Sequence, residues 1–230
     1  MKNVGILGGL GPDATIEYYK TIISLANKRW EYKKPEIIIY SFDGGKFAEL
    51  IEFNKDYDKL KKLLENSICS LYSSGADFGF IACNSAHIFF DDLEKTSPMP
   101  LISISDSIAK KAEKSRYENV GLIGTKMTMN NDFYFDSFKK IDLRLKTPPE
   151  ESQELIHEKI VDELVKGIMK DETKSKLNEV CKKFINRENL DSLILGCTEL
   201  PLILSQRDFD VTLLNPIKIH ANTAFKYCLD

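Results

Sequence analysis

The segment at positions 80–87 reads Phe-Ile-Ala-Cys-Asn-Ser-Ala-His, and positions 193–201 read Leu-Ile-Leu-Gly-Cys-Thr-Glu-Leu-Pro. In each segment an apolar run typical of a buried strand leads into a cysteine, Cys83 or Cys197. Small or polar residues that can begin a helix follow both cysteines. The chain therefore carries two similar junctions, each with a thiol at the end of a strand.

A second pair of similar segments precedes the cysteines. Positions 4–9 read Val-Gly-Ile-Leu-Gly-Gly, and positions 120–125 read Val-Gly-Leu-Ile-Gly-Thr. The interval from the first of these segments to Cys83 nearly equals the interval from the second to Cys197. The two halves of the chain are therefore predicted to share one fold, with two acid/base groups that face one cleft.

Segments with strand and helix character alternate along the chain. Strand-like runs lie at 2–7, 36–42, 78–82, 101–104, 119–123, 193–196 and 211–214. Helical periodicity or composition lies at 15–30, 58–74, 107–114, 128–140, 153–169, 172–186 and 216–228. Apolar strands that are each followed by a helix indicate parallel sheets covered on both faces, which is the α/β class.

We expect two pseudo-symmetric α/β domains, each a parallel-rich sheet flanked by helices. The break between them is placed near 98–104, and the last strand and helix are expected to return to the first domain. The domains are then 1–100 with 209–230, and 101–208. Because ligands of such sheets bind beyond the carboxyl ends of the strands, Gly8, Cys83, Thr125 and Cys197, which follow predicted strands, are expected near the ligand.

The composition excludes several classes of protein. Hydrophobic residues make up 43% of the 230 and charged residues 29%, as in ordinary globular proteins. A net charge of −3 argues against a nucleic-acid partner. No apolar stretch approaches the roughly 18 residues of a membrane helix, and the first residues lack a signal-peptide layout. Five cysteines without close zinc or redox spacing favour reduced thiols and a cytoplasmic location.

Positions 8–15 form a glycine-rich turn, Gly-Gly-Leu-Gly-Pro-Asp-Ala-Thr, between a predicted strand and a predicted helix. Glycines permit positive φ and close approach of a ligand, and amides at a helix start attract anions. The turn also satisfies a loose dinucleotide pattern at Gly9, Gly11 and Ala14, with Asp43 as its rough acidic partner. A small-anion contact, a structural turn and a dinucleotide site all remain open.

The five cysteines fall into two groups. Cys69, Cys181 and Cys228 lie on apolar faces of predicted helices, where buried and inert thiols are expected. Cys83 and Cys197 precede predicted helix N-termini, where the dipole and free amides favour a thiolate.

Three interpretations of the Cys83–Cys197 pair compete. A disulfide is disfavoured in a reducing compartment. A zinc site could recruit His87, but a fourth ligand is not apparent in the sequence. Acid/base chemistry fits best, because a thiolate can remove a proton from one face of a carbon while a thiol returns one to the other face.

These motifs resemble the aspartate/glutamate racemase family. The likeness rests on positions 5–15, 82–87 and 196–201, and it extends to Asp-Phe-Tyr at 132–134 and Glu-Leu-Val-Lys-Gly at 163–167. It runs nearly from end to end of the chain, and the two cysteine motifs together are specific.

The resemblance implies a cofactor-independent amino-acid racemase, with two pseudo-symmetric domains, the active site between them, and a homodimer. Cys83 and Cys197 fall on the two catalytic cysteines of the family. This favours racemisation of aspartate, from L to D and back, by a two-base mechanism. The alternative within the family is a broad-specificity amino-acid racemase. We expect no metal and no cofactor.

The resemblance also points to residues that hold the substrate carboxylates. Aspartate-specific relatives use an arginine and a lysine for this purpose, and Lys166 matches the lysine. Positions 41–47 read Ser-Phe-Asp-Gly-Gly-Lys-Phe and lack the arginine, so Lys46 is the nearest cation. Because lysine does not reproduce the bidentate fork of arginine, broader specificity stays open.

Further residues are expected around the substrate because they follow the cysteines or lie at matching turns. They are Leu10, Asn84, Ser85, Thr125, Thr128, Thr198 and Glu199. Ser85 and Thr198 could also cap helices, and Glu199 could tune the thiol of Cys197 or bind the substrate ammonium. His87 is interpreted as a satisfied interior or supporting histidine rather than as the base for Cys83. Two other functional classes stay open: a nucleotide-dependent oxidoreductase, and a binding protein without turnover.

Overall fold

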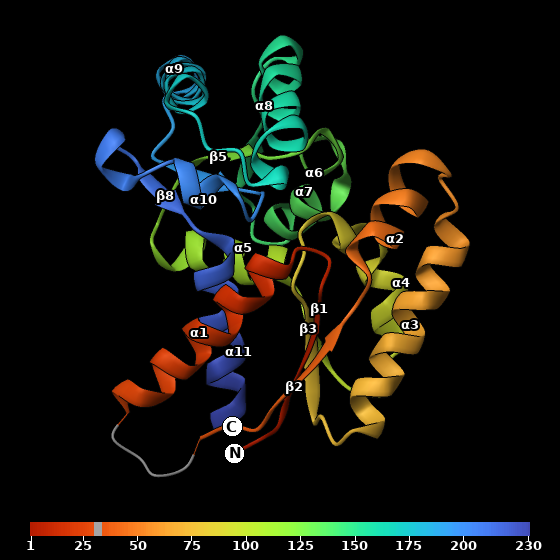
Figure 1. Ribbon diagram of the computed structural model, residues 1–230. Helices are drawn as coiled ribbons and strands as arrows, with labels where there is room; N and C mark the ends of the chain where they lie inside the picture. Colours follow the sequence, from red (N-terminus) through yellow and green to blue (C-terminus); the bar gives the residue numbers. More distant parts are fainter. Residues whose placement is uncertain (30–33) are drawn as a thin grey trace. The chain divides into compact units, whose positions relative to one another are not determined.

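The computed structural model describes residues 1–29 and 34–230 and confirms the α/β fold class. Contacts divide the chain into two compact units, residues 1–104 with 217–230 and residues 105–216. Each unit contains a parallel four-stranded sheet (Figure 1). The strand order is β2-β1-β3-β4 in the first unit and β6-β5-β7-β8 in the second, so the predicted internal repeat is present in the topology.

The inner strands of the first sheet are β1 and β3. Its strands are β1 (Val4–Gly8), β2 (Ile37–Ser41), β3 (Phe78–Ile81) and β4 (Leu101–Ile102). Every residue of β1 and of β3 is buried, which is the pattern of a parallel strand covered on both faces. The edge strand β2 is half-buried to exposed.

Two helices from opposite ends of the chain cover one face of the first sheet. These are α1 (Pro12–Lys28) and α11 (Pro216–Leu229), which lie side by side in Figure 1. Tyr18 and Ile22 of α1 and Phe225 of α11 share a hydrophobic cluster with Ile6 of β1. Trp30, at the end of the predicted helix 15–30, lies outside the described residues.

The other helices and turns of the first unit lie between β2 and β4 in the sequence. It comprises α2 (Gly44–Ala48), the π-helical turn η1 (Glu49–Phe53), α3 (Tyr57–Ser73), the 3-10 turn η2 (Ser85–Phe89) and α4 (Phe90–Thr96). Helix α3 packs on the sheet opposite to α1 and contacts Gly5 of β1 through Leu71 (Figure 1).

The inner strands of the second sheet are β5 and β7. Its strands are β5 (Asn119–Ile123), β6 (Arg144–Lys146), β7 (Ser192–Leu195) and β8 (Thr212–Leu214). The helices and turns of this unit are α5 (Ile104–Lys114), α6 (Lys126–Asn130), α7 (Asp132–Lys139), α8 (Glu150–Asp162), η3 (Leu164–Lys166), α9 (Asp171–Glu188), α10 (Leu200–Ile203) and η4 (Gln206–Asp208). Ile156 and Ile160 of α8 and Leu177 and Phe184 of α9 pack with Leu193 of β7.

The second domain boundary differs from the prediction. The segment 209–230 was predicted to belong to the first domain, but its strand, β8, pairs with β7 in the second sheet. The segment from 217 alone returns to the first unit. The prediction was wrong for 209–216 because strand pairing is not encoded in the local pattern of a three-residue strand.

Two predicted helices are broken in the structure. The segment 128–140 is interrupted at Asn131, whose extended backbone and side-chain oxygen cap α7. The segment 153–169 is helical to Asp162 and then turns, with Gly167 in the left-handed conformation (φ 73°). Lys166 therefore lies on a short turn rather than on a helix.

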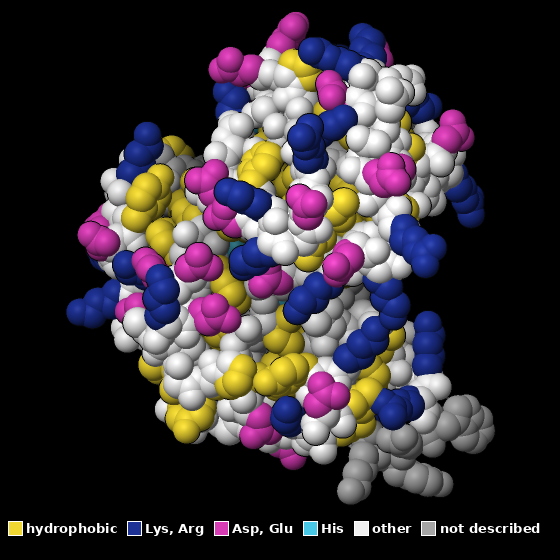
Figure 2. All heavy atoms as spheres, turned by 180° about the vertical axis from the view of Figure 1, so that it is seen from behind, with side chains coloured by type: hydrophobic (Ala, Val, Ile, Leu, Met, Phe, Trp, Pro, Cys, Tyr) yellow, Lys and Arg dark blue, Asp and Glu magenta, His cyan; other side chains and the backbone are white. Residues whose placement is uncertain are grey.

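Among the helices that the structure describes, none has both the length and the apolar character needed to cross a bilayer. On the face drawn in Figure 2, basic and acidic side chains are interspersed.

Candidate active site

Cys83 lies two residues beyond the carboxyl end of β3 and is half-buried. Strand β3 pairs with the other inner strand, β1, with Leu7 beside Ile81. Asn84, which is buried, and Ser85, which is half-buried, follow the cysteine at the start of η2. Their sequence-predicted place at the carboxyl edge of the first sheet is therefore what the structure shows.

Cys197 has the equivalent place in the second unit, two residues beyond the carboxyl end of β7. Strand β7 pairs with the other inner strand, β5, with Ile123 beside Leu195. The Cys197 side chain is buried, and its Sγ donates to Oε2 of Glu199 at 2.8 Å. The Thr198 hydroxyl donates to the same oxygen at 2.8 Å. The thiol, hydroxyl and carboxylate thus form one connected group.

The helices after the two cysteines are shorter than predicted. Cys83 is followed by the five-residue 3-10 turn η2, and Cys197 by α10, which has four residues and begins at Leu200. A dipole grows with the number of aligned peptide units, so these turns supply less stabilisation of a thiolate than full helices would.

The remaining cysteines are not alike. Burial raises the pKa of Cys181 to about 12 and that of Cys228 to about 11, as expected for inert thiols. The prediction for Cys69 was wrong, because this side chain is exposed. The buried stripe of α3 runs through Leu64, Ile68 and Leu71, and Cys69 lies beside it.

Close backbone packing explains the glycine turn. A side chain at Gly9 would lie 2.2 Å from the carbonyl oxygen of Phe42, and Gly9 has a φ of +81°. The Thr15 hydroxyl accepts the Gly9 amide at 2.9 Å and donates to the Gly11 carbonyl at 3.1 Å. These contacts favour the structural interpretation of the turn over a dinucleotide site. Leu10, at the tip of the turn, is half-buried.

Asp43 and Lys46 lie in the loop and helix that follow β2. Asp43 Oδ1 accepts the amides of Gly45 and Lys46 and caps α2, so the acidic residue proposed for a dinucleotide site has a structural use. The Lys46 side chain is exposed. It lies on α2, which begins beyond the carboxyl end of β2, at the same edge of the sheet as Cys83.

The two predicted threonines of the second unit follow β5. Thr125 Oγ1 accepts the amide of Thr128 at 3.3 Å and caps α6, so capping is one of its uses. Thr128 is fully buried and packs against Gly124 and Gly196. A packing role therefore accounts for Thr128, whereas Thr125 is half-buried at the carboxyl edge of the sheet.

Lys166 lies on the turn η3 and is exposed. Its Nζ pairs with Asp162 Oδ1 at 3.5 Å. Leu164, the first residue of η3, belongs to the hydrophobic cluster that also contains Cys197 and Leu200. The turn is thus anchored to the core beneath the second cysteine.

Two buried histidines brace the end of β4, an arrangement that the sequence did not reveal. His87 Nδ1 donates to the Cys83 carbonyl at 2.7 Å, and its Nε2 accepts the Ile104 amide at 3.1 Å. His220 Nε2 donates to the Ile102 carbonyl at 2.9 Å, and its Nδ1 accepts the Tyr18 hydroxyl at 2.9 Å. Because backbone groups engage both ring nitrogens of His87, the structure favours the supporting role over that of a base.

In the part of the chain that the structure describes, no three His, Cys, Asp or Glu side chains are grouped to hold a metal ion. The zinc interpretation of Cys83 and His87 therefore lacks further ligands among these residues.

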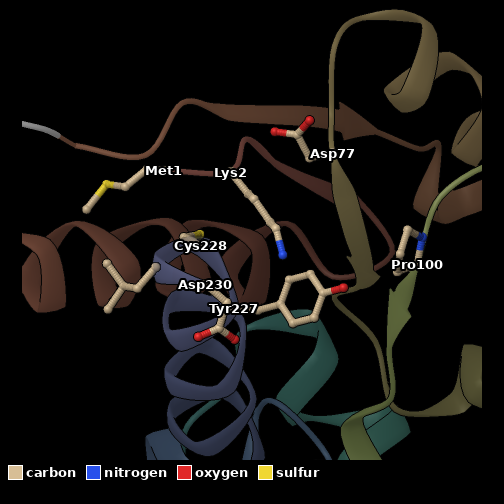
Figure 3. Close-up of a pocket in the computed structure, with 8 residues that line it drawn as sticks. Met1, Lys2, Asp77, Pro100, Tyr227, Cys228 and Asp230 are labelled. Carbon is tan, nitrogen blue, oxygen red and sulfur yellow. The ribbon is translucent and has the colours of Figure 1, made fainter.

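A pocket of about 570 Å³ lies at the opposite edge of the first sheet (Figure 3). Its lining includes Lys2, Asp77 and Pro100, which precede β1, β3 and β4, together with Tyr227 at the end of α11. The Lys2 ammonium lies 4.2 Å from the centre of the Tyr227 ring. This pocket is at the amino ends of the strands and is separate from the cysteine edge.

The structure thus places two sets of predicted site residues at the carboxyl edges of the sheets: Leu10, Lys46, Cys83, Asn84 and Ser85 in the first unit, and Thr125, Thr128, Cys197, Thr198 and Glu199 in the second. Lys166 lies in the second unit on the turn that follows α8.

Comparison with known proteins identifies the family. The sequence profile of the Asp/Glu/Hydantoin racemase family matches residues 7–224. The chain belongs to this family and is a racemase of it. This membership agrees with the resemblance that the cysteine motifs indicated.

The chain is similar to racemases named for different substrates. The solved structure of an aspartate racemase homologue from Pyrococcus horikoshii OT3 is 33% identical, with a TM-score of 0.85 and full coverage of both chains. The broad specificity amino-acid racemase of Bacillus subtilis (strain 168) is 22% identical over 92% of each chain. A glutamate racemase of Oceanobacillus iheyensis is 33% identical over 54% of this chain and 45% of its own.

Proposed function

We propose that this racemase interconverts L- and D-aspartate without a cofactor, with Cys83 and Cys197 as the two acid/base groups. The observation that carries the proposal is their equivalence: each cysteine lies two residues beyond an inner strand, β3 or β7, which pairs with the other inner strand of its own sheet. The resemblance to an aspartate racemase homologue along the whole chain supports the choice of substrate.

The proposed reaction moves one proton on and one proton off the α-carbon. The thiolate of one cysteine takes the α-proton, and the electron pair of the broken C–H bond spreads into the α-carboxylate. The thiol of the other cysteine donates its proton to the opposite face of the same carbon. The enzyme is left with thiol and thiolate exchanged, so the pair titrates and acts as a unit.

Electrostatic contacts must stabilise the carbanion-like transition state, because the α-proton of an amino acid is weakly acidic. Backbone amides after the two cysteines are the groups we assign to this task, and the ammonium of Lys166 is assigned to the side-chain carboxylate of the substrate. The Glu199 carboxylate beside Cys197 favours the protonated thiol, since a thiolate would place two negative charges next to each other. We therefore assign Glu199 to Cys197 rather than to the substrate ammonium.

A broader amino-acid specificity is the second candidate. The observation in its favour is the loop after β2, where Lys46 is the nearest cation and no arginine is present. A lysine holds a carboxylate as a point charge without a bidentate fork, so it discriminates less between substrate side chains. The likeness to the broad specificity enzyme of Bacillus subtilis agrees with this second candidate.

A panel of L-amino acids in D2O, followed by proton NMR, separates the candidates. Loss of the α-proton signal with aspartate alone supports the aspartate racemase. Exchange with several amino acids moves the assignment to the broad-specificity enzyme and keeps the two-thiol mechanism. Binding of acidic ligands without exchange in any of them contradicts the proposed function and indicates a binding protein. The homodimer and the cytoplasmic location stay predictions.

A further inference from the structure

The turn that carries Lys166 is built around the residue that ends helix α8. Glu163 follows α8, and its carbonyl oxygen accepts the amides of Lys166 at 3.1 Å and Ile168 at 2.9 Å. Gly167, in the left-handed conformation, donates to the carbonyl of Leu164 at 2.9 Å. The backbone of Lys166 is therefore fixed relative to Glu163 and to the end of the helix.

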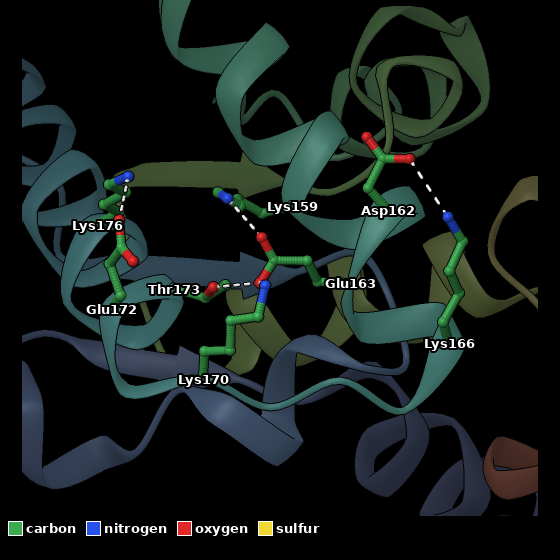
Figure 4. A network of polar contacts seen from close by, with 8 residues as sticks. All are labelled: Lys159, Asp162, Glu163, Lys166, Lys170, Glu172, Thr173 and Lys176. Carbon is green, nitrogen blue, oxygen red and sulfur yellow. Dashed lines mark hydrogen bonds and ion pairs between the residues drawn. The ribbon is translucent and has the colours of Figure 1, made fainter.

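The side chain of Glu163 ties the same turn to the next helix. Its carboxylate accepts Lys159 Nζ at 2.5 Å and the hydroxyl of Thr173, and it lies 3.6 Å from Lys170 Nζ (Figure 4). Lys159 belongs to α8 and Thr173 to the first turn of α9, so one carboxylate joins the helices on either side of the turn. Only 8% of Glu163 is exposed, whereas Lys166 points to solvent.

The charge of Glu163 is held by its surroundings. The hydrogen bonds from Lys159 and Thr173 lower the pKa of its carboxyl to about 2, so the group is ionised at neutral pH. Hydrogen bonds to an ionised group are stronger than neutral ones and define geometry better. The Glu163 carboxylate, which is buried and has three partners, therefore fixes the conformation of the turn.

The contact that Lys166 itself makes is of a different kind. Its pair with Asp162 is a solvent-exposed i,i+4 pair at 3.5 Å, with 59% of the lysine side chain and 68% of the aspartate side chain exposed. Such pairs add little stability, so Lys166 can exchange Asp162 for a ligand carboxylate at low cost. The backbone is held firmly while the ammonium stays available.

We infer that Glu163 is the positioning residue that presents Lys166 to the distal carboxylate of the substrate. The inference rests on the proposed function, because it needs Lys166 to bind the side-chain carboxylate of an acidic amino acid. Fixing the Lys166 backbone reduces the conformational freedom that would be lost on binding, and affinity rises accordingly. Glu163 acts through Lys166 and does not touch the reacting atoms.

The test is a double-mutant cycle of Glu163→Gln and Lys166→Ala, measured by steady-state racemisation of L-aspartate. Glutamine keeps the shape and an acceptor for Thr173 but removes the charge. Glu163→Gln should raise KM about tenfold with kcat nearly unchanged, the order expected when a charge-assisted hydrogen bond is lost. In the Lys166→Ala background the same change should have no further effect on KM, because the residue it positions is absent.

The matched control is Glu172→Gln, which removes an exposed carboxylate paired with Lys176 at 2.6 Å on the first turn of α9 (Figure 4). Its KM should equal that of the unaltered protein. A KM for Glu163→Gln equal to that of the control, or an undiminished effect in the Lys166→Ala background, would overturn the inference.

Amide hydrogen exchange separates this inference from the proposed function. Amides of residues 164–168 should exchange faster in Glu163→Gln than in the unaltered protein and in Glu172→Gln. If the unaltered protein exchanges no α-proton of any amino acid, the proposed function fails. The amide hydrogen exchange rates of residues 164–168 then still test whether Glu163 anchors the turn. Equal protection in all three proteins contradicts the anchoring.

Discussion

At the scale of single residues, the contact between Cys197 and Glu199 decides how the second thiol works. The thiol donates to the Glu199 carboxylate at 2.8 Å, and the Thr198 hydroxyl donates to the same oxygen. In the proposed mechanism, this contact favours the protonated thiol that a general acid needs. The sequence placed Glu199 beside the cysteine but did not distinguish a partner of the thiol from a partner of the substrate.

Glu199→Gln should lower kcat for racemisation by about a hundredfold, the size of a general acid–base contribution, with KM nearly unchanged. Glutamine retains an acceptor but loses the charge that favours the protonated thiol. Thr198→Val is the matched control and should lower kcat less than tenfold, because the carboxylate remains. A KM that rises while kcat is preserved would instead assign Glu199 to the substrate ammonium.

His220 makes the stability of the protein sensitive to acid. Burial, together with the nearby His87, lowers the pKa of His220 to about 3, against an ordinary value near 6.5. Between these values the unfolded chain binds the proton and the folded chain does not. The contribution of His220 is therefore complete above about pH 6.5 and is lost as the pH falls toward 3.

In urea unfolding, this one group should reduce the free energy of unfolding by about 1.4 kcal/mol per pH unit below pH 6.5. In His220→Gln, a neutral amide can donate to Ile102 and accept from Tyr18, so the decline with acid should be shallower. Equal slopes for the two proteins between pH 6.5 and pH 4 would exclude a neutral buried His220.

At the scale of elements, the turn between β1 and α1 shows why a glycine motif need not be a ligand site. Gly9 combines a φ of +81° with a backbone carbonyl 2.2 Å from where its side chain would lie. Gly75, after α3, has a φ of +97°, but its side chain would meet no atom within 4 Å. Comparison of Gly9 with Gly75 therefore separates the cost of backbone strain from the cost of steric overlap.

Gly9→Ala should cost about 3 kcal/mol or more, since left-handed strain and overpacking add. Gly75→Ala should cost about 1–2 kcal/mol, because strain acts alone. Chemical denaturation of both variants measures the difference. Similar costs at the two positions would show that the close approach of Gly9 to Phe42 is not maintained in solution.

The alternation of strands and helices was predictable because buried parallel strands and amphipathic helices have distinct periods. The path of the backbone directly after each strand was harder to predict. The short η2 and α10 follow from local backbone geometry, and the break at Asn131 from a cap that a periodicity argument does not register. Lys166 was proposed as a substrate-binding residue from the motif at 163–167. Its place on a turn depends on contacts that Glu163 makes with residues outside that motif.

At the scale of the whole molecule, the two units share the same order of strands. A helix that follows the last strand of each sheet belongs to the other unit. Helix α5 begins at the end of β4, and all of it beyond Ile104 belongs to the second unit, whereas α11 follows β8 and all of it beyond Pro216 belongs to the first. The repeated cysteine segments predicted two similar halves. The pairing of β8 with β7 was not predictable, because it depends on contacts distant in sequence.

The proposed chemistry needs nothing beyond the chain itself, since two thiols supply both proton transfers. Dialysis against a strong chelator should therefore leave the rate of α-proton exchange unchanged. Measurement of exchange before and after chelation, with and without added divalent metal, checks this. A rate that falls on chelation and recovers with metal would replace the two-thiol mechanism.

The measurement that tests the central claim most directly is proton NMR of L-aspartate in D2O, with the unaltered protein beside Cys83→Ser and Cys197→Ser. We predict that the α-proton signal is lost and D-aspartate forms with the unaltered protein, and that racemisation is abolished in both variants. Racemisation that persists in either variant would contradict the assignment of Cys83 and Cys197 as the two acid/base groups.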